Sequence, residues 1–138
     1  MLLVDTNVLI DVLENDADWA DWSVRQLRAQ AQVHELTINP VIYAELSLLF
    51  ESADALDDAI AKMNLQFQEL PRAALFLAGR AFMKYRRAGG NRSNVLADYF
   101  IGAHAAVAGC GILTRDAGRY AGYFPRVPLV TPHTASAR

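Results

Sequence analysis

Short aliphatic runs alternate with longer amphipathic segments along the chain. The short runs each predict a strand, and they cover residues 2–4, 35–38, 66–70, 111–114 and 127–130. The segments between them predict helices, the first beginning just after Thr6 or Asn7 and the others covering residues 16–32, 41–50, 53–63, 71–87, 95–108 and 117–123. Strands that alternate with helices indicate an α/β fold, in which a parallel sheet carries helices on both faces.

The first aliphatic run, Leu2–Val4, is cut by the polar sequence Asp5-Thr6-Asn7. The run shows no polar alternation, so it predicts a strand buried on both faces. Asp5 then lies at the carboxyl end of a central strand, where open α/β sheets place their binding and catalytic residues. Two interpretations stay open at this point, because an Asp in this position can also simply cap the helix that follows.

Three further acids lie in apolar surroundings. Glu45 falls beside the core-facing stripe of helix 41–50, where a carboxylate is costly to bury without compensation, unless it lies at the edge and reaches water. Asp98 is the only formally ionised side chain from residue 95 to residue 114, which favours either a shared acidic site or placement by the helix dipole. Asp116 follows strand 111–114 and repeats the opening order of aliphatic strand, threonine and acid.

Asp5 and Asp116 face one crevice if the strands that precede them are neighbours in the sheet, and Glu45 and Asp98 lie on helices that pack against this sheet. Like charges this close raise one another's pKa and cannot all stay ionised unaided. A hard divalent cation such as Mg²⁺ or Mn²⁺ resolves the conflict, because it takes oxygen ligands and tolerates bound water. An oxygen-lined metal pocket of this kind suits hydrolysis of phosphodiester bonds, since a bound ion activates water and neutralises charge on the leaving oxygen.

Polar residues beside these acids are candidates for contact with substrate. They are Thr6, Asn7, Thr114, Arg115 and Arg92. The two threonines and the asparagine can donate hydrogen bonds to a scissile phosphate or position an acid, whereas the two arginines can hold flanking phosphates. Residues 72–92 contain six Arg or Lys and no Asp or Glu. This stretch is compatible both with a phosphate-steering patch and with an ordinary solvated helix end.

Composition and charge narrow the class of protein. The 138 residues correspond to one domain, and 53% of them are apolar, enough for a core and a partner-binding surface. The formal net charge of -2 leaves no global basic field, so contact with phosphates requires a local patch or metal ions. No signal peptide or membrane span is evident, so the expected location is the cytoplasm. Cys110 is expected to be a buried structural thiol, and His104 a hydrogen-bonded packing residue rather than a metal ligand.

Four ordered motifs resemble the PIN domain, and within it the VapC toxins of bacterial toxin–antitoxin modules. The motifs are Leu3–Leu9, the Glu45 helix after Pro40, Asp98–Ala105 and Leu113–Asp116, and together they span nearly the whole chain. The resemblance implies a three-layer α/β/α sandwich with a parallel five-stranded sheet, formed by residues 1–131 and followed by a frayed tail at 132–138. It also implies a Mg²⁺- or Mn²⁺-dependent endoribonuclease, a homodimer, and inhibition by a VapB-type antitoxin that threads a segment into the active-site groove.

The resemblance also implies roles for individual residues. The acidic quartet of the family, which binds metal and catalyses cleavage, matches Asp5, Glu45, Asp98 and Asp116. Thr6 and Asn7 match the family's polar support after the first acid, and Thr114 matches its Ser or Thr before the last. Many members carry a further acid two or three residues beyond the last motif Asp. Here Gly118 and Arg119 occupy those positions, so we expect one tightly held ion rather than two.

Other interpretations fit less of the sequence. A haloacid-dehalogenase-type phosphatase needs a second Asp two residues after the first, where this chain has Asn7. A receiver-like domain that binds Mg²⁺ without catalysis pairs two acids after the first strand and uses a late lysine, whereas no lysine follows Lys84. A PIN nuclease outside any toxin module, acting in RNA processing or on DNA, stays open. Metal-dependent hydrolysis does not require the ribose 2′-hydroxyl, so RNA as substrate is expected from the resemblance alone.

Overall fold

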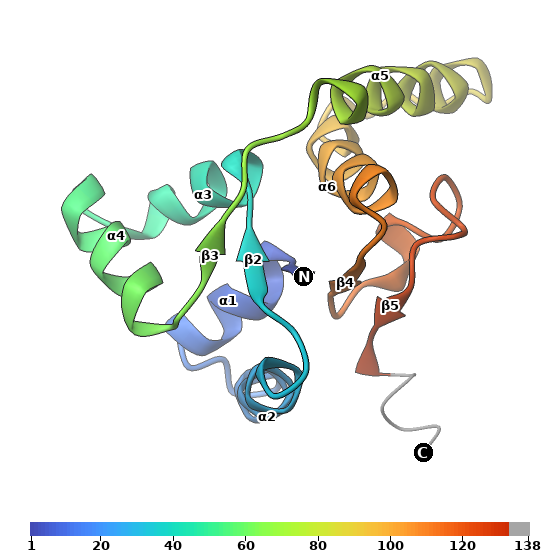
Figure 1. Cartoon of the computed structure of the whole chain (residues 1–138). Coiled ribbons are helices and arrows are strands. Elements are labelled where there is room, and N and C mark those ends of the chain that lie inside the picture. The colour runs from blue at the N-terminus through green and yellow to red at the C-terminus, as the bar shows by residue number, and fades with distance from the viewer. Residues whose placement is uncertain (133–138) are drawn as a thin grey trace.

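Five parallel strands form the central layer of the computed structural model, which describes residues 1–132 (Figure 1). In chain order the strands are β1 (Leu2–Val4), β2 (Leu36–Ile38), β3 (Gln66–Phe67), β4 (Gly111–Leu113) and β5 (Leu129–Val130). Their order across the sheet is β3-β2-β1-β4-β5, and every neighbouring pair is parallel. The predicted α/β fold with a parallel five-stranded sheet is confirmed. The order reverses at β1, where open sheets of this type bind their ligands.

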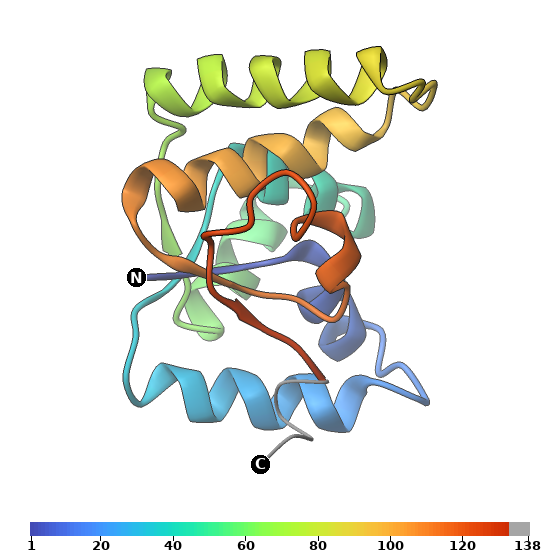
Figure 2. The same ribbon diagram turned by 90° about the vertical axis from the view of Figure 1, so that its right-hand side faces the viewer.

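Helices cover both faces of this sheet. In the described part of the chain they are α1 (Thr6–Leu13), α2 (Ala20–Ala31), α3 (Pro40–Leu46), α4 (Ala53–Lys62), α5 (Arg72–Arg87) and α6 (Val95–Ala108), with two short 3₁₀ helices, η1 (Ser47–Leu49) and η2 (Ala117–Arg119). The helices α5 and α6 stack on each other over one face, and α2 lies over the opposite face (Figure 2). This is the predicted three-layer sandwich. The predicted tail at 132–138 lies outside the described residues from 133 onwards.

Several predicted element boundaries are wrong, each for a local reason. Helix 16–32 begins only at Ala20, because the Asp16 carboxylate accepts hydrogen bonds from backbone N–H groups of the preceding turn. The predicted helix 41–50 ends as an α-helix at Leu46 and continues as the 3₁₀ helix η1. The outer strands β3 and β5 are two residues long rather than four or five.

The segment after β4 differs most from its prediction. Residues 117–123 contain only the three-residue helix η2, because the Asp116 carboxylate accepts from the Gly118 N–H at 3.1 Å and closes a tight turn. The chain after β4 is therefore a folded loop, and it lies against the carboxyl edge of the sheet.

The core is built around the two central strands. Leu3, Val4, Ile112 and Leu113 have no exposed surface, which confirms the prediction that the first strand is buried on both faces. His104 of α6 is 2% exposed, and its Nδ1 accepts from Asn39 Nδ2 at 3.2 Å. Burial lowers the pKa of this imidazole, so it is a neutral packing residue as predicted.

Two smaller expectations concern Cys110 and the membrane. The Cys110 thiol is half-buried against the core rather than fully buried, and burial raises its pKa. A thiol of this kind stays protonated and is a weak nucleophile. Within residues 1–132 no helix has the length and apolar character needed to cross a bilayer.

Burial predicts the response of the fold to truncation of leucine side chains. Leu3→Ala removes a side chain with no exposed surface from the central strand, and we expect it to lower the free energy of unfolding by about 2–5 kcal/mol. Leu48→Ala removes the same atoms from a side chain that is 86% exposed, and we expect a change below about 0.5 kcal/mol. Urea unfolding followed by circular dichroism measures both. Equal losses in the two variants would contradict this description of the core.

Candidate active site

The pairing of β1 with β4 brings two of the predicted acids to one edge of the sheet. Val4 and Leu113 are register partners, so Asp5 and Thr114 leave the sheet side by side. Asp116 follows two residues later in the loop that crosses this edge. The condition on which the predicted site depended, that the strands preceding Asp5 and Asp116 are neighbours, is therefore met.

Asp5 is a buried carboxylate that is held on one side only. Its side chain has no exposed surface, and its Oδ2 accepts hydrogen bonds from Thr114 Oγ1 and from the Tyr120 hydroxyl, each at 2.8 Å. Its Oδ1 has no hydrogen-bond partner, and the closest cationic group is Arg119 Nη1 at 3.9 Å. Such an oxygen is costly to bury unless a cation compensates it.

The simpler interpretation of Asp5 as a helix cap does not hold. Asp5 occupies the N-cap position of α1, in place of the predicted Thr6 or Asn7, but its carboxylate makes no capping hydrogen bond. Both hydroxyl donors to this carboxylate come from the far end of the chain. The side chain therefore faces the edge of the sheet, as the functional interpretation requires.

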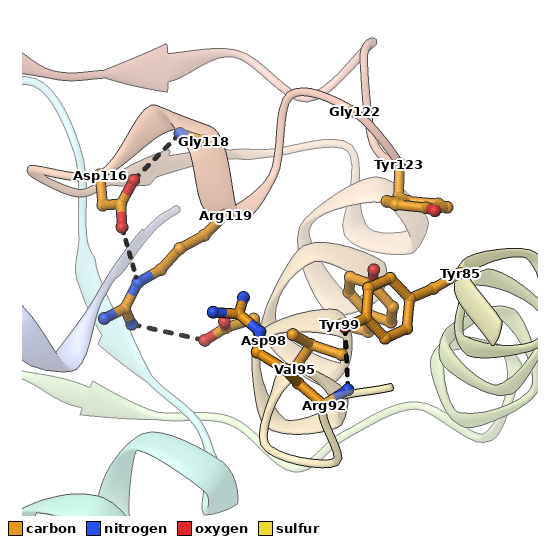
Figure 3. Close-up of a pocket in the computed structure, with 10 residues that line it drawn as sticks. All are labelled: Tyr85, Arg92, Val95, Asp98, Tyr99, Asp116, Gly118, Arg119, Gly122 and Tyr123. Atoms are coloured by element: carbon orange, nitrogen blue, oxygen red, sulfur yellow. Dashed lines mark hydrogen bonds and ion pairs between the residues drawn. The ribbon is translucent and has the colours of Figure 1, made fainter. Parts of the chain in front are cut away.

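Arg119 connects three of the acids, two of which, Asp98 and Asp116, are drawn with it in Figure 3. Its Nε lies 3.2 Å from Asp116 Oδ2, and its Nη1 lies 3.4 Å from Asp98 Oδ1. The same Nη1 is the group nearest the unpartnered oxygen of Asp5. Asp98 comes from the first turn of α6, whereas Asp116 precedes the 3₁₀ helix η2 and Arg119 is its last residue. One guanidinium thus lies among three carboxylates from three different elements.

The charges in this cluster interact strongly. The pKa of Asp98 is raised to about 6, mainly by burial and also by the negative charges of Asp5, Glu45 and Asp116, while Arg119 lowers it. Each of the other three predicted acids therefore acts on Asp98. The quartet is one electrostatic unit, even though its members come from residues 5 to 116.

Glu45 lies at the border of this unit. It is partly exposed on α3, and its Oε1 accepts from Thr6 Oγ1 at 2.6 Å. It also lines a shallow apolar groove between α3 and α6, together with Ala97, the residue before Asp98. Glu45 is therefore neither a plain surface acid nor a buried one. The hydrogen bond from Thr6 ties it to the start of α1, next to Asp5.

The predicted polar residues position the acids. Thr114 Oγ1 donates to Asp5 and accepts from the Asp116 N–H at 3.0 Å, so it links the two strand-end acids directly. Asn7 Nδ2 donates to the same Thr114 oxygen at 3.4 Å, and Asn7 Oδ1 accepts from the Arg115 N–H at 3.4 Å. These bonds hold the start of α1 against the loop after β4. Of the two predicted roles, positioning an acid is the one that these contacts support.

The two predicted arginines lie in different surroundings. The Arg115 guanidinium forms a two-point pair with buried Asp11, with Nε–Oδ2 at 2.7 Å and Nη2–Oδ1 at 3.0 Å. Asp11 also accepts from Ser23, so this pair fastens the loop to α1 and α2. Arg92 is exposed and lines the same cavity as Asp98. Only Arg92 is placed beside the acids.

Sequence reasoning missed the residues that compensate the acids. Tyr120 is fully buried and donates to Asp5, and desolvation raises its pKa well above the ordinary value, so it remains a hydrogen-bond donor. Arg119 was noted only as a position where an acid is absent. Both residues fall within four positions of Asp116, in a loop already expected to lie at the site. Their closeness to the last acid was the signal that could have identified them.

The donor set suits a divalent cation. Within residues 1–132 no three Asp, Glu, His or Cys side chains form a ready-made metal cluster, and the Arg119 guanidinium lies among the carboxylates of Asp5, Asp98 and Asp116. The groups that surround it are carboxylate oxygens, the ligands of hard ions such as Mg²⁺ and Mn²⁺. The buried Asp5 Oδ1 has no hydrogen-bond partner and is free to bind a cation. The residues present therefore fit such an ion once Arg119 moves aside.

Several solved structures share this fold. VapBC2 from Rickettsia felis, bound to a DNA fragment from its promoter, is 16% identical with a TM-score of 0.72, covering 94% of this chain and 97% of that chain. FitAcB from Neisseria gonorrhoeae is 18% identical with a TM-score of 0.70, covering 96% and 99%. VapBC-1 from nontypeable Haemophilus influenzae is 14% identical with a TM-score of 0.71, covering 94% and 96%. At these identities the likeness shows the fold alone.

The sequence comparison with families is more specific. No curated protein matches the chain. The family model of the PIN domain matches residues 2–125, a range that includes all four acids, both strand ends and Tyr120. The match confirms the resemblance identified from the motifs. The chain belongs to the PIN domain family, whose members are nucleases.

Proposed function

We propose that this protein is a metal-dependent endoribonuclease that hydrolyses RNA phosphodiester bonds, and that it is the toxin of a VapBC-type toxin–antitoxin module. One observation carries the nuclease part of the proposal. Carboxylates from β1, α6 and the loop after β4 converge on a single guanidinium at the switch point of the sheet. Because three carboxylates surround one guanidinium, the site favours a divalent cation over a neutral ligand, and such a cation in turn attracts a phosphate.

Asp5, Asp98 and Asp116 would hold Mg²⁺, or Mn²⁺, with Glu45 completing the acidic quartet. When bound, the ion supplies positive charge for the phosphate and lowers the pKa of a water for attack. Thr114 and Tyr120 donate to Oδ2 of Asp5, so Oδ1 is the oxygen that would bind an ion. Arg119 pairs with these carboxylates and would have to move away from them before they could hold an ion. The guanidinium is then free to contact the substrate phosphate.

The RNA substrate is proposed from the likeness to VapC toxins and from the placement of cations. Arg92 lines the cavity beside Asp98, where it can contact a phosphate next to the one that is cut. Three further cations lie in the last turn of α5, which leads towards Arg92. Thr6, Asn7 and Thr114 support this substrate indirectly by positioning acids. We assign to Arg115 the role of holding the loop after β4, because its guanidinium is already paired with the Asp11 carboxylate.

A protein partner is part of the proposal. The solved structures with this fold are complexes of VapB and VapC type, and on that basis we propose a VapB-type antitoxin, a homodimer and a cytoplasmic location. Exposed apolar side chains on α5 support a protein partner: Leu75 is 43% exposed, Phe76 65% and Met83 38%. A nuclease outside a toxin module would lack an antitoxin reading frame immediately upstream. It would also leave growth unchanged when expressed.

Removal of Asp98 tests the catalytic part of the proposal. We expect wild-type protein to cleave total cellular RNA with Mg²⁺ in single-turnover assays and to lose cleavage with a chelator. Asp98→Asn should lower the rate by about 100-fold or more, because one carboxylate of the metal site becomes neutral. Asp58→Asn removes the same charge from a surface pair with Lys62 and should cleave like wild type. Undiminished RNA cleavage by the Asp98 variant would count against this site. If wild-type protein does not cleave RNA at all, the alternative of a metal-binding domain without catalytic activity would explain the result.

The raised pKa of Asp98 predicts how stability depends on pH. Between its ordinary pKa of 3.8 and the folded value of about 6, this carboxyl binds more protons in the folded protein than in the unfolded chain. The free energy of unfolding therefore falls as pH rises through this window. Asp98→Asn removes the penalty, so it should stabilise the metal-free protein by about 1–2 kcal/mol at neutral pH, allowing for partial exposure. Near pH 4 the variant and wild type should differ little.

Urea unfolding in a chelator, at neutral pH and near pH 4, measures this difference. The result separates activity from folding, since the same substitution should abolish cleavage and raise stability. If Asp98→Asn lowers the free energy of unfolding equally at both pH values, the favourable contacts of the carboxylate outweigh the cost of its burial and of its neighbours' negative charges.

Arg119 predicts opposite effects on metal binding and on stability. Arg119→Met keeps the aliphatic part of the side chain and removes the cation that competes with the metal. We expect Mn²⁺ to bind about tenfold more tightly to this variant, while the metal-free protein melts at a lower temperature. Arg126→Met, at an exposed arginine of the same loop, should change neither. Isothermal titration with Mn²⁺ and thermal unfolding in a chelator provide the measurements. Unchanged Mn²⁺ affinity would limit Arg119 to a structural role.

A further inference from the structure

We propose that Asp11, a buried acid outside the acidic quartet, is a positioning residue of the active site. Through its pair with Arg115 it holds Thr114 and Asp116 at the edge of the sheet, and it thereby sets how tightly the site binds a divalent ion. The inference rests on the proposed nuclease function, since Asp116 belongs to the proposed metal site. Within residues 1–132 the Asp11 carboxylate is hydrogen-bonded to Arg115 and Ser23, not to any of the four acids.

Asp11 is fully compensated by donors from two other elements. It lies on α1 and is 1% exposed. Arg115 Nε and Nη2 donate to its Oδ2 and Oδ1 at 2.7 Å and 3.0 Å, and Ser23 Oγ of α2 donates to Oδ2 at 2.9 Å. Both oxygens are thus occupied, whereas Asp5 has one oxygen without a hydrogen-bond partner. Asp11 is therefore closed to a metal ion and acts only through the residues that it holds.

Arg115 is held at its side chain and at its main chain. Its guanidinium pairs with Asp11 at two points and lies over the ring of Trp19, 5.3 Å from the ring centre. Its backbone N–H donates to Asn7 Oδ1 at 3.4 Å. A planar guanidinium bound at two points keeps one orientation, which a single contact would not ensure. Contacts with α1 and with the residue before α2 thus locate the main chain at residue 115.

The residues on either side of Arg115 face the acids. Thr114 Oγ1 donates to Asp5 at 2.8 Å and accepts from the Asp116 N–H at 3.0 Å. The Asp116 carboxylate pairs with Arg119, and its side chain is 53% exposed, so packing alone does not fix its direction. Because residue 115 lies between the two, a shift of its main chain moves both. The buried pair on one side of the loop thereby controls the metal-facing groups on the other.

Stability alone does not account for the pair between Asp11 and Arg115. A buried ion pair adds little net stability relative to apolar side chains of the same size, because both charges lose their hydration. A two-point pair adds direction, since it holds a loop in one place. Metal sites depend on such support, because residues that orient the ligands change the metal affinity when they are removed. The expected role of Asp11 is therefore geometric.

Titration with Mn²⁺ of Asp11→Asn, Arg115→Gln and the double variant tests this proposal. We expect each single variant to bind Mn²⁺ about tenfold more weakly than wild type, the lower end of the loss typical of residues that orient metal ligands. The double variant should lose no more than a single one, because both changes remove the same interaction. It also leaves no unpaired charge in the interior, so it provides the measurement if a single variant does not fold.

Leu56→Ala is the control for a general loss of stability. Leu56 is 2% exposed in α4, which leads to the outer strand β3 and lies away from β4 (Figure 1). This variant should be less stable than wild type, yet bind Mn²⁺ within about twofold of it, because the two sites are distant.

Cleavage kinetics at saturating Mn²⁺ separate positioning from contact with substrate. Asp11→Asn and Arg115→Gln should both lower the maximal rate and leave the KM for RNA within about twofold of wild type. If Arg115 instead binds a phosphate, Arg115→Gln alone would raise this KM, because Asp11→Asn leaves the guanidinium in place and unpaired. That result would contradict the proposal.

Hydrogen exchange in a chelator follows the loop without any metal. The amide protons of Thr114 and Asp116, which donate to the Val130 carbonyl and to Thr114 Oγ1, should exchange at least about tenfold faster in Asp11→Asn, while those of α5 exchange as in wild type. If wild type neither binds Mn²⁺ nor cleaves RNA while this difference is present, the proposed nuclease function fails, and the role of Asp11 in holding the loop is still supported.

Two further results would overturn the proposal. One is a folded Asp11→Asn protein with the Mn²⁺ affinity and the loop exchange of wild type. The other is an equal loss of Mn²⁺ affinity in Leu56→Ala, which would reduce Asp11 to a contributor to general stability.

Discussion

A buried carboxylate with one unsatisfied oxygen is the constraint on which this structure depends. Asp5 has no exposed surface, and the fold surrounds it with two hydroxyl donors and a guanidinium from the loop after β4. Without them, the negative charge at the end of the central strand would be too costly to bury. The compensation is incomplete, because Oδ1 keeps no hydrogen-bond partner. A site that stabilises its own charge only in part is prepared to accept a cation.

The loop after β4 supplies most of this compensation within seven residues. Thr114 links the two strand-end acids, Asp116 caps its own turn, Arg119 reaches three carboxylates, and Tyr120 closes over Asp5. A long helix in this segment would have spread these side chains around its axis. The short 3₁₀ turn instead directs them to one edge of the sheet. The separate pair between Arg115 and Asp11 fastens the loop from behind, so its position does not depend on the acids alone.

Acidic, basic and aromatic side chains line one cavity. The acids repel a bare phosphate and favour a divalent cation, so under the proposed function they would control which part of a substrate reaches the reactive position. Tyr85, Tyr99 and Tyr123 line the same cavity and give it an aromatic side next to the acids. Arg119 belongs to both, since it contacts the acids and lines the cavity. Its movement away from the carboxylates would couple metal binding to contact with the phosphate.

The sequence by itself determined the α/β class, the strand–helix alternation and the acidic quartet, because buried strands and isolated acids leave a local signal in the order of residues. Local patterns also predicted the packing role of His104. Tertiary structure alone decided which oxygen of Asp5 is free, that Arg119 separates the acids, and that Thr6 and Asn7 position acids rather than cap α1. It also decided that Tyr85 and Tyr123 share a wall beside Asp98. These features depend on distances between residues far apart in the chain, and such distances exist only once the sheet has brought β1 and β4 together.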